Sequence, residues 1–338
     1  MNDPVLVDVS RGASVESRHR GAVSIFDFDL RPVLQIGDTD QPVFPRSSVK
    51  AIQALPLIES GAADAFGFDD KKIALACASH SGEPEHTELA GSMLTAIGLD
   101  EPALECGSHW PSRHEAAMDL ARAGQSPNQL HNNCSGKHAG FLAVCRHCGF
   151  DRQGYVEPDH RLQAVIREAM TEVTGAAHDE TNRAVDGCSI PTYAIPLKNL
   201  AQGFARMAGG KSLGGERAKA AQRLLSANMR HAFYVAGTGR ADTAIMNAAP
   251  GRIFVKTGAE GVYCGAAPEL GLAFAIKCDD GANRGSEAVV AGLLERLFAK
   301  DAALSAALGV LARPIIHSRK GVAVGQVRPA GALLDVRI

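Results

Sequence analysis

Strand-like apolar runs lie near both ends of the chain, and patterns with helical spacing fill its middle. Residues 21–28 (GAVSIFDF) and 31–37 (RPVLQIG) are joined by a short polar connection, which predicts a hairpin. Towards the other end, three more strand-like runs are separated by turns that contain Gly or Pro: RIFVKTG, GVYCGAA and LGLAFAIKC. We therefore expect strands from both ends of the chain.

Helical patterns begin directly after the first hairpin. In residues 44–61 apolar side chains recur at helical spacing, a serine can cap the start, and Pro56 should bend the helix or end its first stretch. Residues 71–79 (KKIALACAS) fit either a buried strand or a helix. Further helical segments, between about residues 85 and 229, are HTELAGSMLTAIG, HEAAMDLARAG, SGKHAGFLAVCRHCG, DHRLQAVIREAMTEV and GERAKAAQRLLSANM, and SEAVVAGLLERLF follows the last strands.

The order of these elements predicts an α+β fold. Its simplest form is a mainly antiparallel sheet built from both ends of the chain and flanked by helices, with a helical lobe inserted. The expected boundaries are residues 1–85 and 235–338 for the sheet-containing lobe and residues 86–234 for the helical lobe.

Composition narrows the class of function. The 338 residues carry a formal charge of only -2 and no block of Lys or Arg, which argues against nucleic-acid or membrane-surface binding and favours a small-molecule substrate. No run approaches the length of a membrane span, and the first 20 residues hold no apolar signal core. We therefore expect a cytoplasmic enzyme whose eight cysteines are reduced thiols or metal ligands rather than disulfides.

Ser47 and Lys50 form an SxxK arrangement at the opening of a predicted helix. Their spacing places both side chains on one face, where a neutral lysine could activate the serine hydroxyl. Because free lysine titrates near pH 10.4, burial or a second cation must lower its pKa. For an isolated motif the simpler interpretation is a helix cap followed by a solvated lysine.

Two further elements strengthen the catalytic interpretation. The turn Ser79-His80-Ser81 follows the SxxK motif, and Lys256-Thr257-Gly258 follows the strand-like run RIFV. SxxK, a serine-containing turn and KTG occur in this order in penicillin-binding proteins and serine β-lactamases. They supply the nucleophile and base, a proton-relay hydroxyl, and an edge strand with a lysine. The middle element here reads SHS instead of SDN, so its relay chemistry does not carry over unchanged.

A second group of residues suggests a metal site. Cys134 lies one helical turn from Lys137 and His138, and Cys188 follows some fifty residues later. Two thiolates and one nitrogen favour Zn²⁺, with a fourth position left open. Spacing alone favours His138 as the nitrogen donor, because lysine must first lose a proton. Buried structural cysteines are the alternative.

Together these segments resemble the asparaginase II family, the rhizobial inducible L-asparaginase type. The resemblance covers roughly residues 5–285 and rests on SRHRGAVSIFD, FPRSSVKAIQALPLIESG, ACASHSGEPEH, HNNCSGKHAG, DGCSIPTYAIPL and KTGAEGV. It implies a serine β-lactamase and glutaminase-like fold, a homodimer, and hydrolysis of L-asparagine to aspartate and ammonia.

The resemblance also assigns residues. It implies two serine–lysine pairs, Ser47 with Lys50 and Ser79 with Lys256, with Ser47 as nucleophile. It implies zinc held by Cys134, Lys137 and Cys188, against the choice of His138 from spacing, so we keep His138 as a residue beside the metal ligands. The residues that we expect to bind substrate are Asp186, His138, Arg46 and Asn133.

The resulting hypothesis is a serine amidohydrolase that forms an acyl-enzyme on Ser47, with zinc assisting substrate binding. Three alternatives stay open. One is a zinc-hydroxide hydrolase in which the serines are bystanders. Another is a glutaminase or peptide-amide hydrolase on the same fold, because one methylene gives only modest discrimination. The last is a zinc-stabilised binding protein with a decayed site.

Overall fold

The computed structural model describes residues 3–336, whose centre is an antiparallel sheet. Its strands are β1 (Val5–Arg11), β2 (Ser14–Asp27), β3 (Pro32–Ile36), β8 (Phe254–Thr257), β9 (Val262–Ala267), β10 (Leu272–Cys278), β11 (Ile315–His317) and β12 (Ala323–Pro329). Their order is β11-β12-β1-β2-β10-β9-β8, with β3 also paired to β2. The predicted α+β fold, with an antiparallel sheet built from both ends of the chain, is confirmed.

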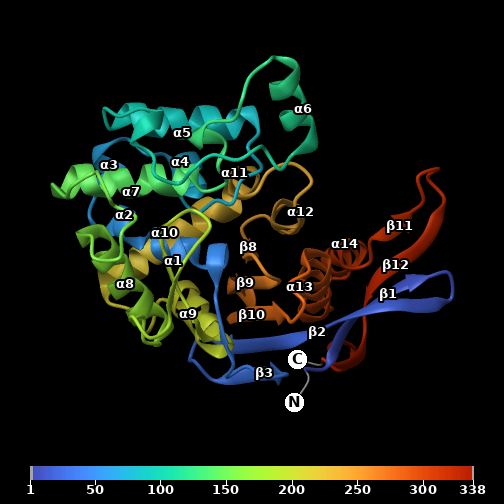
Figure 1. Ribbon diagram of the computed structural model, residues 1–338. Coiled ribbons are helices and arrows are strands. Elements are labelled where there is room, and N and C mark those ends of the chain that lie inside the picture. The colour runs from blue at the N-terminus through green and yellow to red at the C-terminus, as the bar shows by residue number, and fades with distance from the viewer. Residues whose placement is uncertain (1–2, 337–338) are drawn as a thin grey trace.

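The long strand β2 joins two parts of this sheet. Its second half pairs with β10 and β3, so that Ile25 lies opposite Phe274 and Leu34, which confirms the predicted hairpin. Its first half pairs with β1, and this part extends with β11 and β12 away from the helices (Figure 1). The sequence pattern revealed only the second half, because it is buried on both faces, whereas the first half alternates between exposed and partly buried residues.

Helices occupy most of the chain between β3 and β8. They are α1 (Lys50–Gln53), α2 (Leu55–Glu59), α3 (Ala62–Ala65), α4 (Asp70–Ala76), α5 (Pro84–Ala96), α6 (His114–Arg122), α7 (Ser135–Cys148), α8 (Arg161–Thr174), α9 (Leu197–Gly209), α10 (Gly215–Arg230), α11 (Ala232–Val235) and α12 (Ala241–Ala248). Each predicted helical segment of this region forms a helix. Pro56 stands in the first turn of α2, directly after the break that separates α1 from α2. The ambiguous segment 71–79 contributes most of α4.

Several short elements lie between these helices and strands. They are the 3₁₀ turn η1 (Arg46–Val49), the pair β4 (Pro42–Val43) and β7 (Ile195–Pro196), and the hairpin β5 (Arg183–Val185) with β6 (Pro191–Tyr193). After β10 come α13 (Asn283–Leu297), the last predicted helix, and α14 (Ala302–Ala312).

Two helices cover the sheet. Helix α9, which the sequence analysis did not identify, packs against β2, β9 and β10, while α13 packs against β1, β9, β10 and β12 (Figure 1). Helices α1, α2 and α4 pack on α7, α8 and α10, so segments before and after residue 85 share one helical region. The exact lobe boundaries stay a prediction. None of the helices in residues 3–336 combines the length and the apolar character that a membrane crossing needs.

Candidate active site

A cavity of about 570 Å³ opens where η1, the end of β8 and the loop after α4 meet. Ser47, Ser79, Asn133, Thr257 and Gly258 all contribute to its lining. Segments far apart in the sequence thus bring both predicted serines to one space, with the KTG motif beside them. The cavity is the candidate active site.

Ser47 lies in the turn η1, directly after a strained residue. Arg46 has a φ of 52°, a left-handed backbone conformation that is unfavourable for a side chain of this size. The Ser47 side chain is partly exposed, and among residues 3–336 its hydroxyl has no hydrogen-bond partner. The neighbouring Ser48 instead turns inward and donates its hydroxyl to Pro45 O at 2.8 Å. Ser47 is therefore the serine of this turn that faces the cavity with a free hydroxyl.

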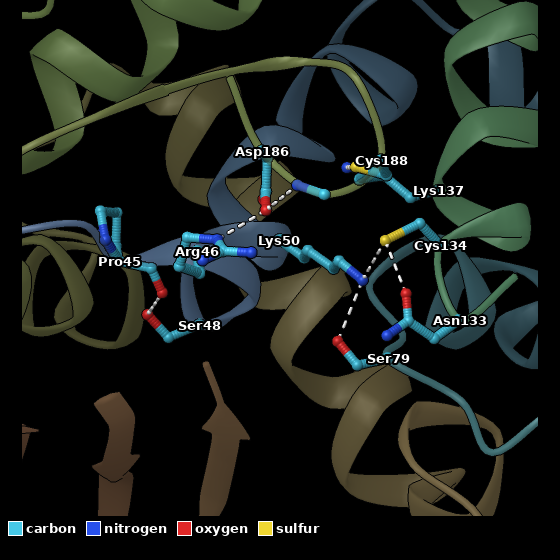
Figure 2. A network of polar contacts seen from close by, with 11 residues as sticks. Pro45, Arg46, Ser48, Lys50, Ser79, Asn133, Cys134, Lys137, Asp186 and Cys188 are labelled. Atoms are coloured by element: carbon cyan, nitrogen blue, oxygen red, sulfur yellow. Dashed lines mark hydrogen bonds and ion pairs between the residues drawn. The ribbon is translucent and has the colours of Figure 1, made fainter. Parts of the chain in front are cut away.

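The hydroxyl of Ser79 lies between two lysines. Lys50 Nζ is 3.0 Å and Lys256 Nζ is 2.9 Å from Ser79 Oγ, and both lysines are completely buried (Figure 2 shows Lys50 and Ser79). Lys50 also donates to Ala78 O and to the sulfur of Cys134. The sequence paired Lys50 with Ser47, but in this structure Lys50 contacts Ser79. The two serine–lysine pairs thus converge on one hydroxyl.

The pKa of Lys256 differs from that of a free lysine. Burial lowers it to about 7; the positive charges of Lys50 and Arg240 act in the same direction, and the negative charge of Asp242 opposes them. A substantial fraction of Lys256 is therefore neutral near pH 7, which makes this amine able to accept a proton.

Backbone and histidine contacts hold Ser79 in place. Its N–H donates to Val235 O at 2.9 Å, and the N–H of His80 donates to Asn133 O at 3.2 Å. The His80 ring accepts the Gly82 N–H at Nδ1, so Nε2 carries the proton and donates to Ser135 Oγ at 2.8 Å. Burial keeps the pKa of His80 well below its usual range. His80 therefore stabilises the turn as a neutral ring.

The predicted metal ligands lie next to this group. Lys137 Nζ is 2.9 Å from Cys188 Sγ, and Lys50 Nζ is 3.0 Å from Cys134 Sγ. The Cys134 thiol, by hydrogen bonding, lowers the pKa of Cys188 well below its usual value. Burial opposes the charged form of Lys137, but the negative charges of Cys188 and Asp186 outweigh this effect and raise the pKa of Lys137. In this arrangement Cys188 is a thiolate paired with an ammonium.

The contacts of Lys137 and His138 bear on which nitrogen could join the two cysteines at the predicted zinc site. Within the described residues, no three His, Cys, Asp or Glu side chains are placed to share a metal, so a metal at Cys134 and Cys188 needs a donor of another type. Lys137 is the nitrogen that lies against Cys188. His138 Nδ1 instead shares a hydrogen bond with the Tyr155 hydroxyl at 2.8 Å, and its buried Nε2 has no partner among residues 3–336. The geometry brings Lys137, rather than His138, into contact with the sulfur.

Of the residues predicted to bind substrate, Asn133 lines the cavity, whereas Arg46, Asp186 and His138 are not among its lining residues. Asp186, in the turn of the β5–β6 hairpin, forms an ion pair with Arg46 at 2.6 Å (Figure 2). Burial alone would raise the pKa of Asp186. The positive charges of Lys137 and Arg46 outweigh this effect, so the pKa of Asp186 is lowered. This ion pair fixes the strained residue before Ser47 to the loop that carries Cys188.

Two glycines allow the catalytic segments to approach one another. A side-chain carbon at Gly258 would lie 2.6 Å from Pro45 O, so the KTG strand can pack against the Ser47 turn only without one. At Gly136 the same carbon would lie 2.4 Å from Leu75 O, where α7 crosses α4. These contacts place Ser47 beside β8, and Cys134 beside Lys50.

The sequence analysis did not identify two residues of the site, Arg240 and Asp242. Arg240 lines the cavity, and its Nη1 lies 3.3 Å from Ser79 O. Asp242 is buried and accepts the Thr257 N–H at 2.7 Å and the Tyr263 hydroxyl at 2.8 Å. Both stand at the start of α12, in a segment without a recognisable motif, and only the packing of α12 on β8 brings them to the site.

Comparison with known proteins shows the class of this protein, the amidohydrolases. The family model described as L-asparaginase II matches residues 7–329, nearly the whole chain. The chain belongs to the L-asparaginase II family. No curated protein matches it.

Solved structures give distant similarities. A β-lactamase from Mycobacterium bovis is 12% identical, with 86% of this chain and 95% of that chain covered and a TM-score of 0.40. A protein called Mglu is 15% identical, with 84% of this chain and 67% of that chain covered and a TM-score of 0.36.

Proposed function

We propose that this protein hydrolyses L-asparagine to L-aspartate and ammonia through an acyl-enzyme on Ser47. The observation that carries the proposal is the arrangement of Lys50 and Lys256 around Ser79 Oγ, in the cavity that Ser47 also lines. A serine nucleophile needs an adjacent base, and this arrangement can supply a neutral amine near pH 7. Family membership supports the amide as substrate.

The proposed proton path uses all four side chains. Lys50, whose Nζ donates to Ser79, passes a proton through the Ser79 hydroxyl to neutral Lys256 and becomes neutral itself. Lys50 then accepts the Ser47 proton as Ser47 Oγ attacks the side-chain amide carbon. The contact between Ser47 and Lys50 forms with substrate in place, since catalytic hydrogen bonds commonly tighten only in the substrate complex.

Release of the products follows from the same groups. The C–N bond breaks and the nitrogen takes the proton held by Lys50. Ammonia then departs, and an aspartyl ester remains on Ser47. Water attacks this ester, gives up a proton to Lys50 and releases aspartate, and Ser47 recovers its hydroxyl proton.

Zinc is part of the proposal. Cys134, Lys137 and Cys188 would hold it, and the bound ion would supply positive charge for substrate binding. Homodimer formation and a cytoplasmic location, which the sequence led us to expect, belong to the same proposal. Light scattering on the purified protein tests the dimer.

The direct test is ammonia release from L-asparagine and L-glutamine by purified protein, with and without added Zn²⁺. Selective release from L-asparagine would support the proposal. Preference for L-glutamine would reassign the substrate on the same machinery. A folded, zinc-loaded protein that releases ammonia from neither amide would contradict it.

A further inference from the structure

We propose that Arg240 binds the α-carboxylate of the substrate and thereby selects asparagine whose α-carboxylate is free. The inference rests on the proposed function and deepens it, because it names the group that would distinguish L-asparagine from an asparagine residue within a peptide. It starts from the position and the unused hydrogen-bonding capacity of this side chain.

Arg240 is fixed beside the reacting groups. It immediately precedes α12, and its Nη1 donates to the carbonyl oxygen of Ser79 at 3.3 Å. The hydroxyl of the same Ser79 contacts Lys50 and Lys256. The guanidinium is partly buried and lines the cavity that contains Ser47. A ligand held by Arg240 therefore lies next to Ser79, in the cavity that Ser47 also lines.

The charges of the cavity wall are unbalanced. Its formally charged lining residues are Arg113, Arg240 and Glu115. Arg113 Nε pairs with Glu115 at 2.8 Å, whereas Arg240 forms no ion pair anywhere in residues 3–336. Arg240 is thus the cation in the cavity wall that no carboxylate contacts directly, since Glu287 acts on it only at longer range. A half-buried guanidinium without a counter-ion favours binding of an anion from solution.

Asp242 stands only two residues away but forms no ion pair with this guanidinium. Its Oδ1 accepts the Thr257 N–H at 2.7 Å and its Oδ2 accepts the Tyr263 hydroxyl at 2.8 Å. Both oxygens are therefore engaged in holding β8. The guanidinium of Arg240 retains N–H groups in the fork that matches a carboxylate with two parallel hydrogen bonds.

The size of the proposed substrate agrees with this placement. In L-asparagine only Cα and Cβ separate the carboxylate from the amide carbon that Ser47 would attack. One contact of Arg240 is to the main-chain oxygen of Ser79, so the Ser79 hydroxyl lies one side chain away, and Ser47 lines the same cavity. A peptide or ester lacks the carboxylate and would leave Arg240 without a partner, which a site built for a charged group discriminates against.

The test compares L-asparagine with its α-methyl ester, which keeps the amine and the side-chain amide but lacks the negative charge. We expect wild-type kcat/KM to be lower for the ester. Arg240→Gln should lower kcat/KM for L-asparagine by about 10- to 100-fold, mainly through KM, the range expected for a lost hydrogen bond between charged groups. Arg240→Gln should change kcat/KM for the ester by less than about threefold. Arg240→Lys should restore part of the kcat/KM that Arg240→Gln loses with L-asparagine.

Controls separate this role from a general effect of charge. Because Arg240 also lowers the pKa of Lys256, kinetics are compared on the high-pH plateau of each variant. Arg113→Gln removes a cavity cation that already has a partner. Two results would overturn the inference. One is that Arg113→Gln lowers kcat/KM for L-asparagine as much as Arg240→Gln does. The other is that Arg240→Gln lowers kcat/KM equally for L-asparagine and for the ester.

Binding measurements keep the inference testable if turnover fails. Absence of ammonia release by the wild type would contradict the proposed function alone. Calorimetry then measures the affinity of the wild type and of Arg240→Gln for L-aspartate and for succinate. We expect binding to be at least about tenfold weaker in Arg240→Gln. Equal affinity in the two proteins, or no binding of either dicarboxylate to the wild type, would overturn the assignment of Arg240.

Discussion

Lys50 and Lys256 approach the same atom, with their Nζ nitrogens 3.0 and 2.9 Å from Ser79 Oγ. Both side chains are buried, so two full positive charges at this spacing repel each other strongly. This repulsion is relieved when one of the two amines is neutral. Burial and the charge of Lys50 both lower the pKa of Lys256, which lies at about 7.

The activity should therefore depend on pH through Lys256. Neutral Lys256 is needed to accept a proton, and protonation removes this form as pH falls below about 7, so kcat/KM should rise with pH and level off above neutrality. Asp242 stabilises the charged form, so Asp242→Asn should move the midpoint to lower pH. The measurement is kcat/KM across about pH 5 to 9. A midpoint that stays fixed or moves upward in Asp242→Asn would contradict this assignment.

The two serines should respond differently to substitution. Ser47→Ala should lower kcat by at least about 10³-fold, because the nucleophile is lost, while Ser79→Ala should reduce turnover but leave the nucleophile in place. A diazoketone analogue of L-asparagine, followed by peptide mass spectrometry, checks this. We expect the adduct on Ser47 in the wild type and in Ser79→Ala. An adduct on Ser79 would exchange the two roles.

Gly258→Ala should damage the site more than the fold. The added carbon would lie 2.6 Å from Pro45 O and would push the Ser47 turn from β8, so we expect at least about tenfold lower kcat and a loss of roughly 1 to 3 kcal/mol in unfolding free energy. Gly215→Ala is the matched control, because Gly215 lies in α10 with open space around it. This variant should leave kcat and the unfolding free energy nearly unchanged. Wild-type kcat in Gly258→Ala would refute the close-approach argument.

Metal analysis should identify the nitrogen ligand. Purified protein should contain zinc by elemental analysis, and Cys188→Ser and Lys137→Gln should lose it, because each removes one donor. His138→Gln should retain zinc, since His138 shares its hydrogen bond with Tyr155. Cys148→Ser, at an exposed cysteine, is the control. Loss of zinc in His138→Gln with retention in Lys137→Gln would reverse the choice of ligand.

Chelation separates zinc-assisted binding from a zinc-hydroxide mechanism. If the metal only helps to bind substrate, its removal should raise KM and leave the Ser47 adduct obtainable. Complete loss of turnover with no adduct in the wild type would favour the alternative, in which the metal generates the nucleophile.

Local patterns in the sequence were sufficient for much of the fold. The strand-like run at residues 21–28 and the helical pattern at 135–149 each depend on side chains a few positions apart, and both elements form where expected. Helix α9 was missed, although it is amphipathic, because no strong start signal precedes it: Pro196 provides no side-chain cap. Strands β11 and β12 are short or partly exposed, so their alternation is weak.

The sequence by itself determined the chemical inventory: an SxxK pair, a serine turn, a KTG strand end and a cysteine–lysine segment, recognisable because each occupies a few consecutive positions. Only the tertiary structure decided which groups meet. It placed Lys50 on Ser79 instead of Ser47, and brought Arg240 to the cavity from a segment without a motif. Contacts between residues of different elements depend on how helices and strands pack, through close approaches such as that of Gly258 to Pro45. No local sequence pattern encodes this packing.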